Sequence, residues 1–334
     1  LTKNIRYFCF IFSDECDSIA VMDILNREIE PFINAALDRG KSVLLLGPRQ
    51  AGKTTFIEQV LKPDISLSFA NAETKQQFEK DLVWRVKLLT TEIESFSSPP
   101  LVFIDEVQKI PEIMDTLQDL IDHKKTRFVL SGSSARKLKY GKHVNMLPGR
   151  VILMHLWPLS YREMPNPKPE LFELLNFGAL PDIILQTDTA NKEIDLASYV
   201  TIYLEEEIRQ EATVRNVGHF ARFLQLAASE SGQTINASKL SQDIGVSVVT
   251  IQSYYQILED CLIATRIDPL IQSASNRRLI KAPSYLFFDL GVRRVASNEG
   301  ANPSLETYGK LFEQYVGLEI LTGLSLKKPL SKLR

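Results

Sequence analysis

The residues best suited to chemistry form one octapeptide, Gly-Pro-Arg-Gln-Ala-Gly-Lys-Thr at 47–54. It fits the pattern G-x-x-x-x-G-K-[ST] without a mismatch. The two glycines let backbone N–H groups turn toward phosphate oxygens, and the start of a following helix adds partial positive charge. Lys53 then reaches the β- and γ-phosphates, and the Thr54 hydroxyl coordinates Mg²⁺. The pattern predicts an ATP-binding loop that uses Mg²⁺, formed by Gly47, Pro48, Arg49, Gln50, Ala51, Gly52, Lys53, Thr54 and Thr55.

Two adjacent carboxylates follow the apolar run at 101–104, about 50 residues after the loop. An apolar run of this kind is typical of a buried strand, and ligands bind beyond the carboxyl ends of parallel strands. Asp105 is therefore expected to support the Mg²⁺ ion, and Glu106 to polarise the attacking water. With Lys53 and Glu106 as catalytic residues, the two motifs predict ATP hydrolysis.

Three further residues each allow a functional and a purely structural interpretation. Ser131 and Ser133 follow the apolar run at 127–130, where polar side chains act as sensors of the γ-phosphate or simply form a small-residue turn. Arg150 precedes the run at 151–156. It is either a solvated loop residue or an arginine offered to the γ-phosphate of a neighbouring subunit.

The elements that must position these residues alternate between strands and helices. Apolar runs predict the strands, and helical periodicity predicts helices between them, which together indicate a parallel α/β sheet. Four prolines between 158 and 169 interrupt the pattern, and the chain is then mostly helical to 228. The expected strands are 42–46, 65–69, 101–104, 127–130 and 151–156, and the expected helices are 24–39, 54–61, 82–96 and 111–123.

Composition limits the classes of protein. The chain has 334 residues, 44% hydrophobic and 24% charged, which is typical of a soluble globular protein with two or three domains. The net charge of −2 gives no global basic field for nucleic acid. No apolar run reaches the ~18 residues of a membrane span. The three cysteines, Cys9, Cys16 and Cys261, are too few and scattered for a disulfide framework or zinc site, which indicates a reducing compartment and hence the cytoplasm.

The first 21 residues are expected to be an N-terminal extension of doubtful status. The aromatic-rich run at 5–12 follows Lys3 and Arg6 but lacks a convincing cleavage site for a signal peptide. We favour Met22 as the natural start of the protein over a signal peptide.

Several motifs together resemble a known family. They are GPRQAGKTT at 47–55, LVFIDEVQKIP at 101–111, SGSS at 131–134, LPGR at 147–150 and FGALPD at 177–182. The chain, from about residue 23 to 321, is similar to the bacterial and archaeal AAA-type ATPases paired with a C-terminal domain of unknown function. That family lies near the signal-transducing and origin-recognition branches of the AAA+ superfamily.

The resemblance implies a domain order and several roles. A P-loop ATPase core at 22–160 would be followed by a helical lid at 161–218, in which Pro181 packs against the nucleotide base. A winged-helix domain would span 219–295, with wing strands at 263–267 and 284–288. The sequence independently predicts its helices at 237–245 and 247–259, from a glycine stop and a serine cap. A homo-oligomer is expected if Arg150 completes the nucleotide site of a neighbouring subunit.

Nucleic-acid binding has weak support in the sequence. The segment 247–259, which would be the recognition helix, contains no Lys or Arg, whereas phosphate contacts come mainly from these residues. A packing or relay role for the domain is therefore favoured over DNA reading. A basic cluster elsewhere either touches phosphates or forms a solvated rim; its members are Arg277, Arg278, Lys281, Arg293 and Arg294.

The last segment, 296–334, resembles the truncated start of a C-terminal domain with a restriction-nuclease-like fold, whose opening helix would include 311–316. Glu313 alone cannot build a metal site, so no nuclease activity is expected. The predicted function is that of an ATP-driven AAA+ switch or motor that moves its winged-helix domain. The alternatives are an ATP-controlled nucleic-acid-binding regulator and a structural ATP binder with little turnover.

Overall fold

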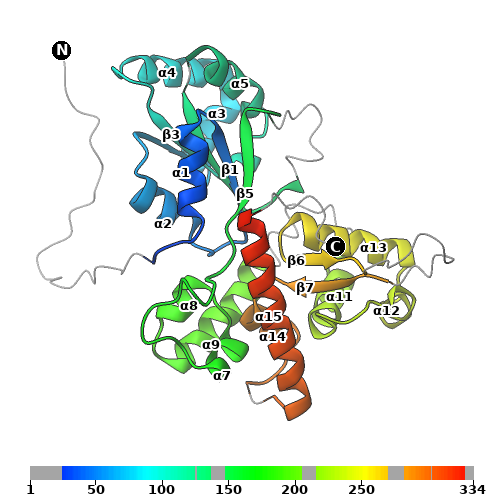
Figure 1. The fold of residues 1–334 in the computed structure, drawn as a ribbon. Helices are drawn as coiled ribbons and strands as arrows, with labels where there is room; N and C mark the ends of the chain where they lie inside the picture. Colours follow the sequence, from blue (N-terminus) through cyan, green and yellow to red (C-terminus); the bar gives the residue numbers. More distant parts are fainter. Residues whose placement is uncertain are drawn as a thin grey trace, which may run out of the picture.

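A computed structural model describes residues 25–124, 126–136, 147–204, 216–269, 282–301 and 303–327. Its centre is a sheet of five strands in which every pairing is parallel. The strand order is β2-β3-β4-β1-β5, and Figure 1 shows helices on both sides of the sheet. The parallel α/β class predicted from the sequence is confirmed. The strands are β1 (Ser42–Leu46), β2 (Ile65–Ser68), β3 (Leu101–Asp105), β4 (Arg127–Gly132) and β5 (Val151–His155).

The central strand β1 explains why these runs are strands. All five of its residues are buried, and successive side chains alternate between two hydrophobic clusters. Leu44 and Leu46 face one cluster, while Val43 and Leu45 face the other, as the period of two in a strand requires. A strand covered on both faces reads as a continuous apolar run.

Helices cover both faces of this sheet. One face is covered by α1 (Glu30–Asp38), which buries Ile33, Ala36 and Leu37. The other face packs against α3 (Ala72–Lys80), α4 (Leu82–Glu94) and α5 (Ile113–Lys124). The predicted helix at 54–61 is a short α2 (Lys53–Phe56) that continues as the π-helix η1 (Ile57–Leu61). A one-turn 3₁₀ helix, η2 (Val107–Lys109), follows β3.

A helical segment follows the sheet. It contains α7 (Leu171–Phe177), α8 (Pro181–Leu185), α9 (Thr189–Ser198) and the π-helix η3 (Tyr199–Leu204). Three helices and a two-stranded antiparallel sheet come next, around a core of their own. They are α11 (Val217–Ser229), α12 (Ala237–Ile244), α13 (Val248–Asp260), β6 (Ala264–Ile267) and β7 (Ser284–Phe287).

The caps predicted for α12 and α13 are present. The Ser247 hydroxyl accepts a hydrogen bond from the Thr250 N–H at the start of α13. Gly245 ends α12 in the left-handed conformation, with φ 79°. The helices form where the sequence predicts them, while the winged-helix assignment stays a prediction.

Two helices close the described chain, α14 (Leu290–Ala296) and α15 (Leu305–Lys327). The predicted helix at 311–316 is part of the much longer α15, which lies beside α7 and β5 (Figure 1). No helix within the described ranges combines the length and the apolar character needed to cross a membrane. Residues 1–21, Met22, Cys9 and Cys16 lie outside the described residues, as do Arg277, Arg278 and Lys281.

The interpretation of Arg293 and Arg294 as phosphate contacts or a solvated rim is wrong. Both are 4% exposed, because α14 packs between α7, α9 and α11. Arg293 pairs with Glu299 and donates to the Ala228 carbonyl, while Arg294 donates to the Asn176 carbonyl at 2.8 Å. Arg294 thus ties α14 to the helical segment, and Arg293 ties α14 to α11.

A buried carboxylate makes a second tie between the same two regions. Asp289 is 1% exposed; its Oδ1 caps α14 through the Val292 N–H at 2.9 Å, and its Oδ2 accepts from the Ala179 N–H at 2.7 Å. A Cβ on Gly178 would lie 2.1 Å from Oδ1, so only glycine fits there. Burial raises the pKa of Asp289 to about 6, although the backbone N–H groups act in the opposite direction.

Asp289 gives the first testable prediction, on stability and pH. The folded protein holds a proton here more tightly than the unfolded chain, whose carboxyl keeps the ordinary pKa of 3.8. The contribution of this group to stability is therefore fully present below that value and is lost as pH rises through about 6. We expect the melting temperature of the wild type, relative to Asp289→Asn, to fall between about pH 4.5 and 7 and then to level off.

Thermal unfolding of both proteins across this pH range checks the prediction. The matched control is Asp243→Asn on α12, which changes the same functional group on the exposed surface. A difference between wild type and Asp289→Asn that stays constant with pH would contradict it.

Candidate functional site

The loop between β1 and α2 is shaped by close backbone contacts. A Cβ on Gly47 would lie 2.1 Å from the Leu156 carbonyl oxygen, and the Gly47 N–H donates to the Gly132 carbonyl at 3.2 Å. Gly52 has φ 85° and Gln50 has φ 57°, so the chain turns sharply before the helix. The close contact is the physical reason for glycine at 47, and the positive φ is the reason at 52.

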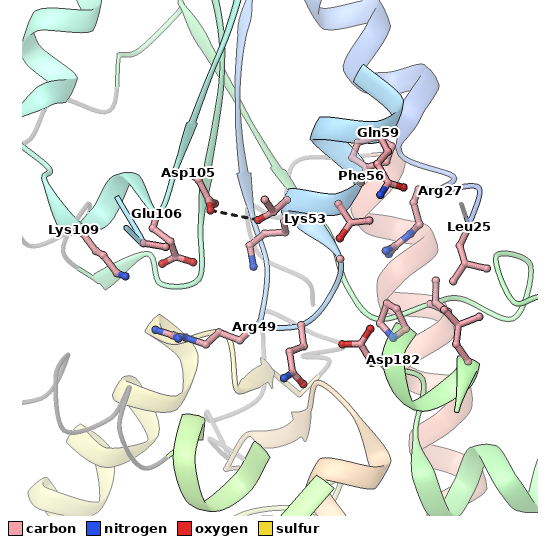
Figure 2. Close-up of a pocket in the computed structure, with 18 residues that line it drawn as sticks. Leu25, Arg27, Arg49, Lys53, Phe56, Gln59, Asp105, Glu106, Lys109 and Asp182 are labelled. Carbon is pink, nitrogen blue, oxygen red and sulfur yellow. Dashed lines mark hydrogen bonds between the residues drawn. The ribbon is translucent and has the colours of Figure 1, made fainter. Parts of the chain in front are cut away.

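Lys53 and Thr54 are the first two residues of α2, and their side chains bond different partners. The Lys53 ammonium is buried and donates to the Gly47 and Pro48 carbonyls, at 2.8 Å each. The Thr54 hydroxyl lies 3.4 Å from Asp105 Oδ2, a bond marked in Figure 2. The loop motif and the carboxylate motif therefore meet in space, as the sequence predicts.

Asp105 ends β3 among hydroxyl groups. Its carboxylate is 6% exposed and accepts hydrogen bonds from Thr54, from Ser68 at 3.3 Å, and from Ser131. The predicted sensor Ser131 thus contacts Asp105 directly. Ser68 was not predicted, because the strand expected at 65–69 placed this residue inside the strand, whereas β2 ends at Ser68.

Glu106 leaves the strand in the left-handed conformation, with φ 54°. Its Oε2 accepts a hydrogen bond from the Ser133 hydroxyl at 3.1 Å and another from the Gln108 side-chain amide. Ser131 and Ser133 therefore each contact one of the two carboxylates. Their role as sensors stays a prediction.

One cavity of about 380 Å³ is lined by Lys53, Thr54, Asp105 and Glu106. Figure 2 shows Glu106 and Lys109 at one end, Lys53 and Asp105 between, and Leu25 at the other end. Charged groups thus line both ends, because Arg27 and Asp182 lie on the same side as Leu25 (Figure 2). The volume suits a small-molecule ligand. The lining includes Leu25, Arg27, Arg49, Gln50, Gly52, Lys53, Thr54, Thr55, Phe56, Gln59, Asp105, Glu106, Lys109, Leu159, Pro181, Asp182 and Leu185.

Pro181 lies at this cavity, and its contact with the nucleotide base stays a prediction. It is the first residue of α8, and its Cγ would be 3.6 Å from a Cβ placed on Gly52. The neighbouring Asp182 also lines the cavity, and burial, with the charge of Asp195, raises the pKa of its carboxyl. The Tyr199 hydroxyl donates to the Arg49 carbonyl at 3.3 Å. The helical segment after the sheet thus touches the loop at two places.

Arg27 is a residue of the site that sequence reasoning missed. Its guanidinium is buried and donates to the Ala51 carbonyl in the loop at 2.8 Å, to the Trp157 carbonyl at 2.6 Å and to Glu163 at 3.2 Å. Burial lowers the pKa of Arg27, and the Glu163 charge opposes that shift. A lone arginine at the start of a predicted helix gives no signal of this role, because its partners lie far along the chain.

Arg150 lies away from this cavity. Val151 pairs with Ser42, the first residue of β1. The loop lies at the carboxyl end of the strands, and Arg150 therefore lies at their amino-terminal end. There it forms a bidentate ion pair with Asp122, with N–O distances of 2.6 and 2.8 Å. The structure does not bring Arg150 to the nucleotide site of its own chain, and the role toward a neighbouring subunit stays a prediction.

Arg27 yields the second prediction. Replacing it in Arg27→Met leaves Glu163 buried without its cation and the Ala51 carbonyl without its anchor. Losing one partner of a buried pair costs about 3–5 kcal/mol. We expect a loss of that order in the free energy of unfolding, measured by chemical denaturation, together with weaker binding of a fluorescent ATP analogue.

The matched control is Arg162→Met, because Arg162 pairs with Glu28 on the surface and its side chain is 83% exposed. An exposed pair contributes about 0–1 kcal/mol. If both variants lost the same small amount of stability, the anchoring role of Arg27 would be refuted.

Comparisons with known proteins agree with this geometry. Residues 39–165 match the sequence family described as an AAA domain, and residues 168–302 match a domain of unknown function, DUF8612. The uncharacterized proteins Rv2008c of Mycobacterium tuberculosis and Mb2031c of Mycobacterium bovis are each 27% identical over 316 residues. Those residues cover 93% of this chain and 69% of each relative.

The solved structures add the fold. The Walker-type ATPase PABY2304 of Pyrococcus abyssi superposes with a TM-score of 0.55 at 14% identity, over 82% of this chain and 96% of that chain. The predicted resemblance to AAA-type ATPases is thus confirmed for the core, while the nuclease-like fold of the last segment stays a prediction. Residues 39–165 are thus similar to an AAA domain, within a fold shared with a Walker-type ATPase, and residues 168–302 are similar to a domain of unknown function.

Proposed function

We propose that this protein binds ATP with Mg²⁺ and hydrolyses it, and that the nucleotide state moves a winged-helix domain through a helical lid. The observation that carries the proposal is the convergence of Lys53, Thr54, Asp105 and Glu106 on one cavity. The backbone N–H groups of the loop and the Lys53 ammonium would hold the phosphates. Pro181 would pack against the base, with Leu25 and Leu159 beside it.

The residues present fit a Mg²⁺ ion. Asp105 is a buried carboxylate whose partners among the described residues are hydroxyl groups, and one of these, on Thr54, is itself a good Mg²⁺ ligand. Mg²⁺ prefers one or two protein oxygens together with phosphate and water, so a site without a cluster of acidic residues suits it. Thr54 and Asp105 would hold the ion, which neutralises charge on the phosphate oxygens when bound.

Glu106 is the general base of this proposal. Its carboxylate would orient a water molecule in line with the γ-phosphorus and accept a proton from it as the new P–O bond forms. The bond from that phosphorus to the bridging oxygen breaks, and the products are ADP and phosphate. The Lys53 ammonium stabilises the charge that develops on the phosphate oxygens.

A continuous set of contacts supports the coupling. Pro181 lies at the cavity, and the Ala179 N–H two residues earlier donates to Asp289, which caps α14. A ligand that displaces Pro181 would therefore also shift α14 and, with it, the domain that contains α11 to α13. We assign residues 161–218 to the lid, 219–295 to the winged-helix domain and 296–334 to the start of a further domain.

Assembly and location complete the proposal. A homo-oligomer is proposed, in which Arg150 reaches the γ-phosphate of a neighbouring subunit. We also propose a cytoplasmic location, because the three cysteines of the chain are too few and too scattered for a disulfide framework. Nucleic acid is a weaker candidate partner, because α13 contains no Lys or Arg.

The third prediction tests hydrolysis. Glu106→Gln removes the base but keeps the shape of the side chain, so we expect the turnover of Mg-ATP to fall about 100-fold or more, with ATP affinity changed less than about threefold. Lys53→Ala should lose ATP binding itself. The matched control is Glu112→Gln, the same change at an exposed position just after the motif.

The same assay separates the rival functions. Turnover that rises with protein concentration and falls in Arg150→Ala would support an oligomeric motor, and stimulation by DNA would support a nucleic-acid-binding regulator. Equal, negligible turnover in wild type and Glu106→Gln, with ATP bound by both, would leave a structural ATP binder and sink the proposal.

A further inference from the structure

Gln108 lies beside the proposed general base, within the 3₁₀ turn that follows β3. Its side chain is 2% exposed, and its amide nitrogen contacts both Glu106 Oε2 and the Ser133 hydroxyl, the latter at 3.1 Å. The Ser133 hydroxyl in turn donates to Glu106 Oε2 at 3.1 Å. The three side chains therefore form a closed ring of hydrogen bonds.

The orientation of this amide follows from chemistry. An ionised carboxylate only accepts hydrogen bonds, so the nitrogen of Gln108, and not its oxygen, must face Glu106. The Gln108 oxygen then points away and has no hydrogen-bond partner among the described residues. It lies against Gly132, where an added Cβ would be 2.6 Å from it.

A purely structural role does not account for Gln108. A buried acceptor without a partner costs about 1–3 kcal/mol, which a methionine of similar length would avoid. Gln108 accepts that cost and also needs glycine at 132 to make room. What the amide supplies and methionine does not is a donor group that bonds Glu106 and also Ser133, which itself bonds Glu106.

Glu106 itself needs such a donor. Its side chain has three rotatable bonds and stands at the end of the strand on a left-handed backbone, with φ 54° and ψ 44°. Both hydrogen bonds from the described residues end on Oε2, so they fix one oxygen and leave Oε1 to face the reacting water. Figure 2 shows the carboxylate of Glu106 within the cavity.

We infer that Gln108 is a positioning residue for hydrolysis: together with Ser133 it holds Oε2 of Glu106 and so aims the other carboxylate oxygen at the attacking water. This inference rests on the proposed function of Glu106. Gln108 touches neither ATP nor water in this role, and acts only through Glu106. Its loss lowers the turnover number without weakening ATP binding, because misaligned groups slow the chemical step alone.

The fourth prediction compares two replacements of similar length. Gln108→Met removes the donor, and we expect kcat to fall about 10- to 100-fold, with KM and the Kd for ATP changed less than about twofold. Gln108→Glu places a carboxyl there that donates only when protonated. The ratio of its kcat to that of Gln108→Met should therefore rise as pH is lowered from about 8 to 5.5, which a packing role would not produce.

The matched control is Gln77→Met. Gln77 also donates its amide to a glutamate, Glu73, at 3.2 Å, but on the outer surface of α3. This variant should keep wild-type kcat and KM. Thermal unfolding of every variant identifies any that fails to fold, in which case Gln108→Glu, the closest in shape, carries the comparison through its pH dependence.

The outcomes separate this inference from the proposed function. If the wild type turns over ATP and Gln108→Met keeps its kcat, the positioning role of Gln108 is overturned while hydrolysis by Glu106 stands. A parallel rise of KM and loss of ATP binding in Gln108→Met would also overturn it, because Gln108 would then serve the loop. Absence of wild-type turnover would overturn hydrolysis, and with it the purpose assigned to Gln108.

Discussion

The register of three parallel strands is the constraint on which the site depends. Ser68 of β2 pairs with Asp105 of β3, and the pairing of Ile104 with Leu130 places Ser131 of β4 opposite Asp105 on the other side. The three side chains therefore stand in line at the carboxyl edge of the sheet, and both hydroxyls bond the carboxylate between them. A slip of one residue would turn Asp105 to the opposite face, because side chains alternate along a strand.

The same edge explains how the phosphate loop is held. β1 lies between β4 and β5, so the loop leaves the sheet with the Gly132 carbonyl on one side and the Leu156 carbonyl on the other. Backbone groups of both neighbours fix Gly47, and no side chain fits between them. Arg27 then ties the far end of the loop to Trp157 through carbonyl oxygens. The shape of the loop is thus fixed mainly by contacts with backbone groups.

Buried polar contacts join the later domain to the rest, beside an apolar cluster that includes Phe177, Tyr199, Phe288 and Val292. Asp289, Arg293 and Arg294 are buried, and each bonds a backbone group of another element. Such bonds have defined directions, whereas apolar contacts tolerate sliding. Buried polar groups add little net stability, so fixing one arrangement of the domains is the better account of them. The absence of a Cβ at Gly178 and Gly291 allows the backbones to approach closely enough for these bonds.

Sequence reasoning succeeded where the signal is local and failed where it depends on distant partners. The loop pattern, the apolar runs of β1 and β3, and the caps of α13 are each contained in a few consecutive residues. Arg27 bonds a carbonyl 130 residues away, and Asp289 one N–H group 110 residues away, so no local pattern reveals them. The helix α3 was missed because only Phe78 of its nine residues is buried, which leaves almost no apolar periodicity.

Arg293 and Arg294 show the opposite failure. Charge alone favoured an exposed site, but long side chains reach buried carbonyls once their helix is enclosed. Gln108 is a related case, since glutamine two residues after a carboxylate has no distinctive spacing, and only the left-handed turn at Glu106 brings the two side chains together.

The two edges of the sheet carry different electrostatics, and this bears on how subunits would meet. At the carboxyl edge, Lys53 and the loop N–H groups place positive charge at the cavity, beside the carboxylates of Asp105 and Glu106. At the amino edge, Arg150 is matched by Asp122 on the surface, where the pair is open to solvent. Exposed ion pairs hold little free energy because water screens them and both side chains lose freedom. The Asp122 pair is bidentate, however, and its two hydrogen bonds must break before Arg150 can bind the phosphate of a neighbouring subunit, the role proposed for it. What limits that role is geometry: Arg150 lies at the sheet edge opposite its own loop, so any phosphate that it reaches belongs to another chain.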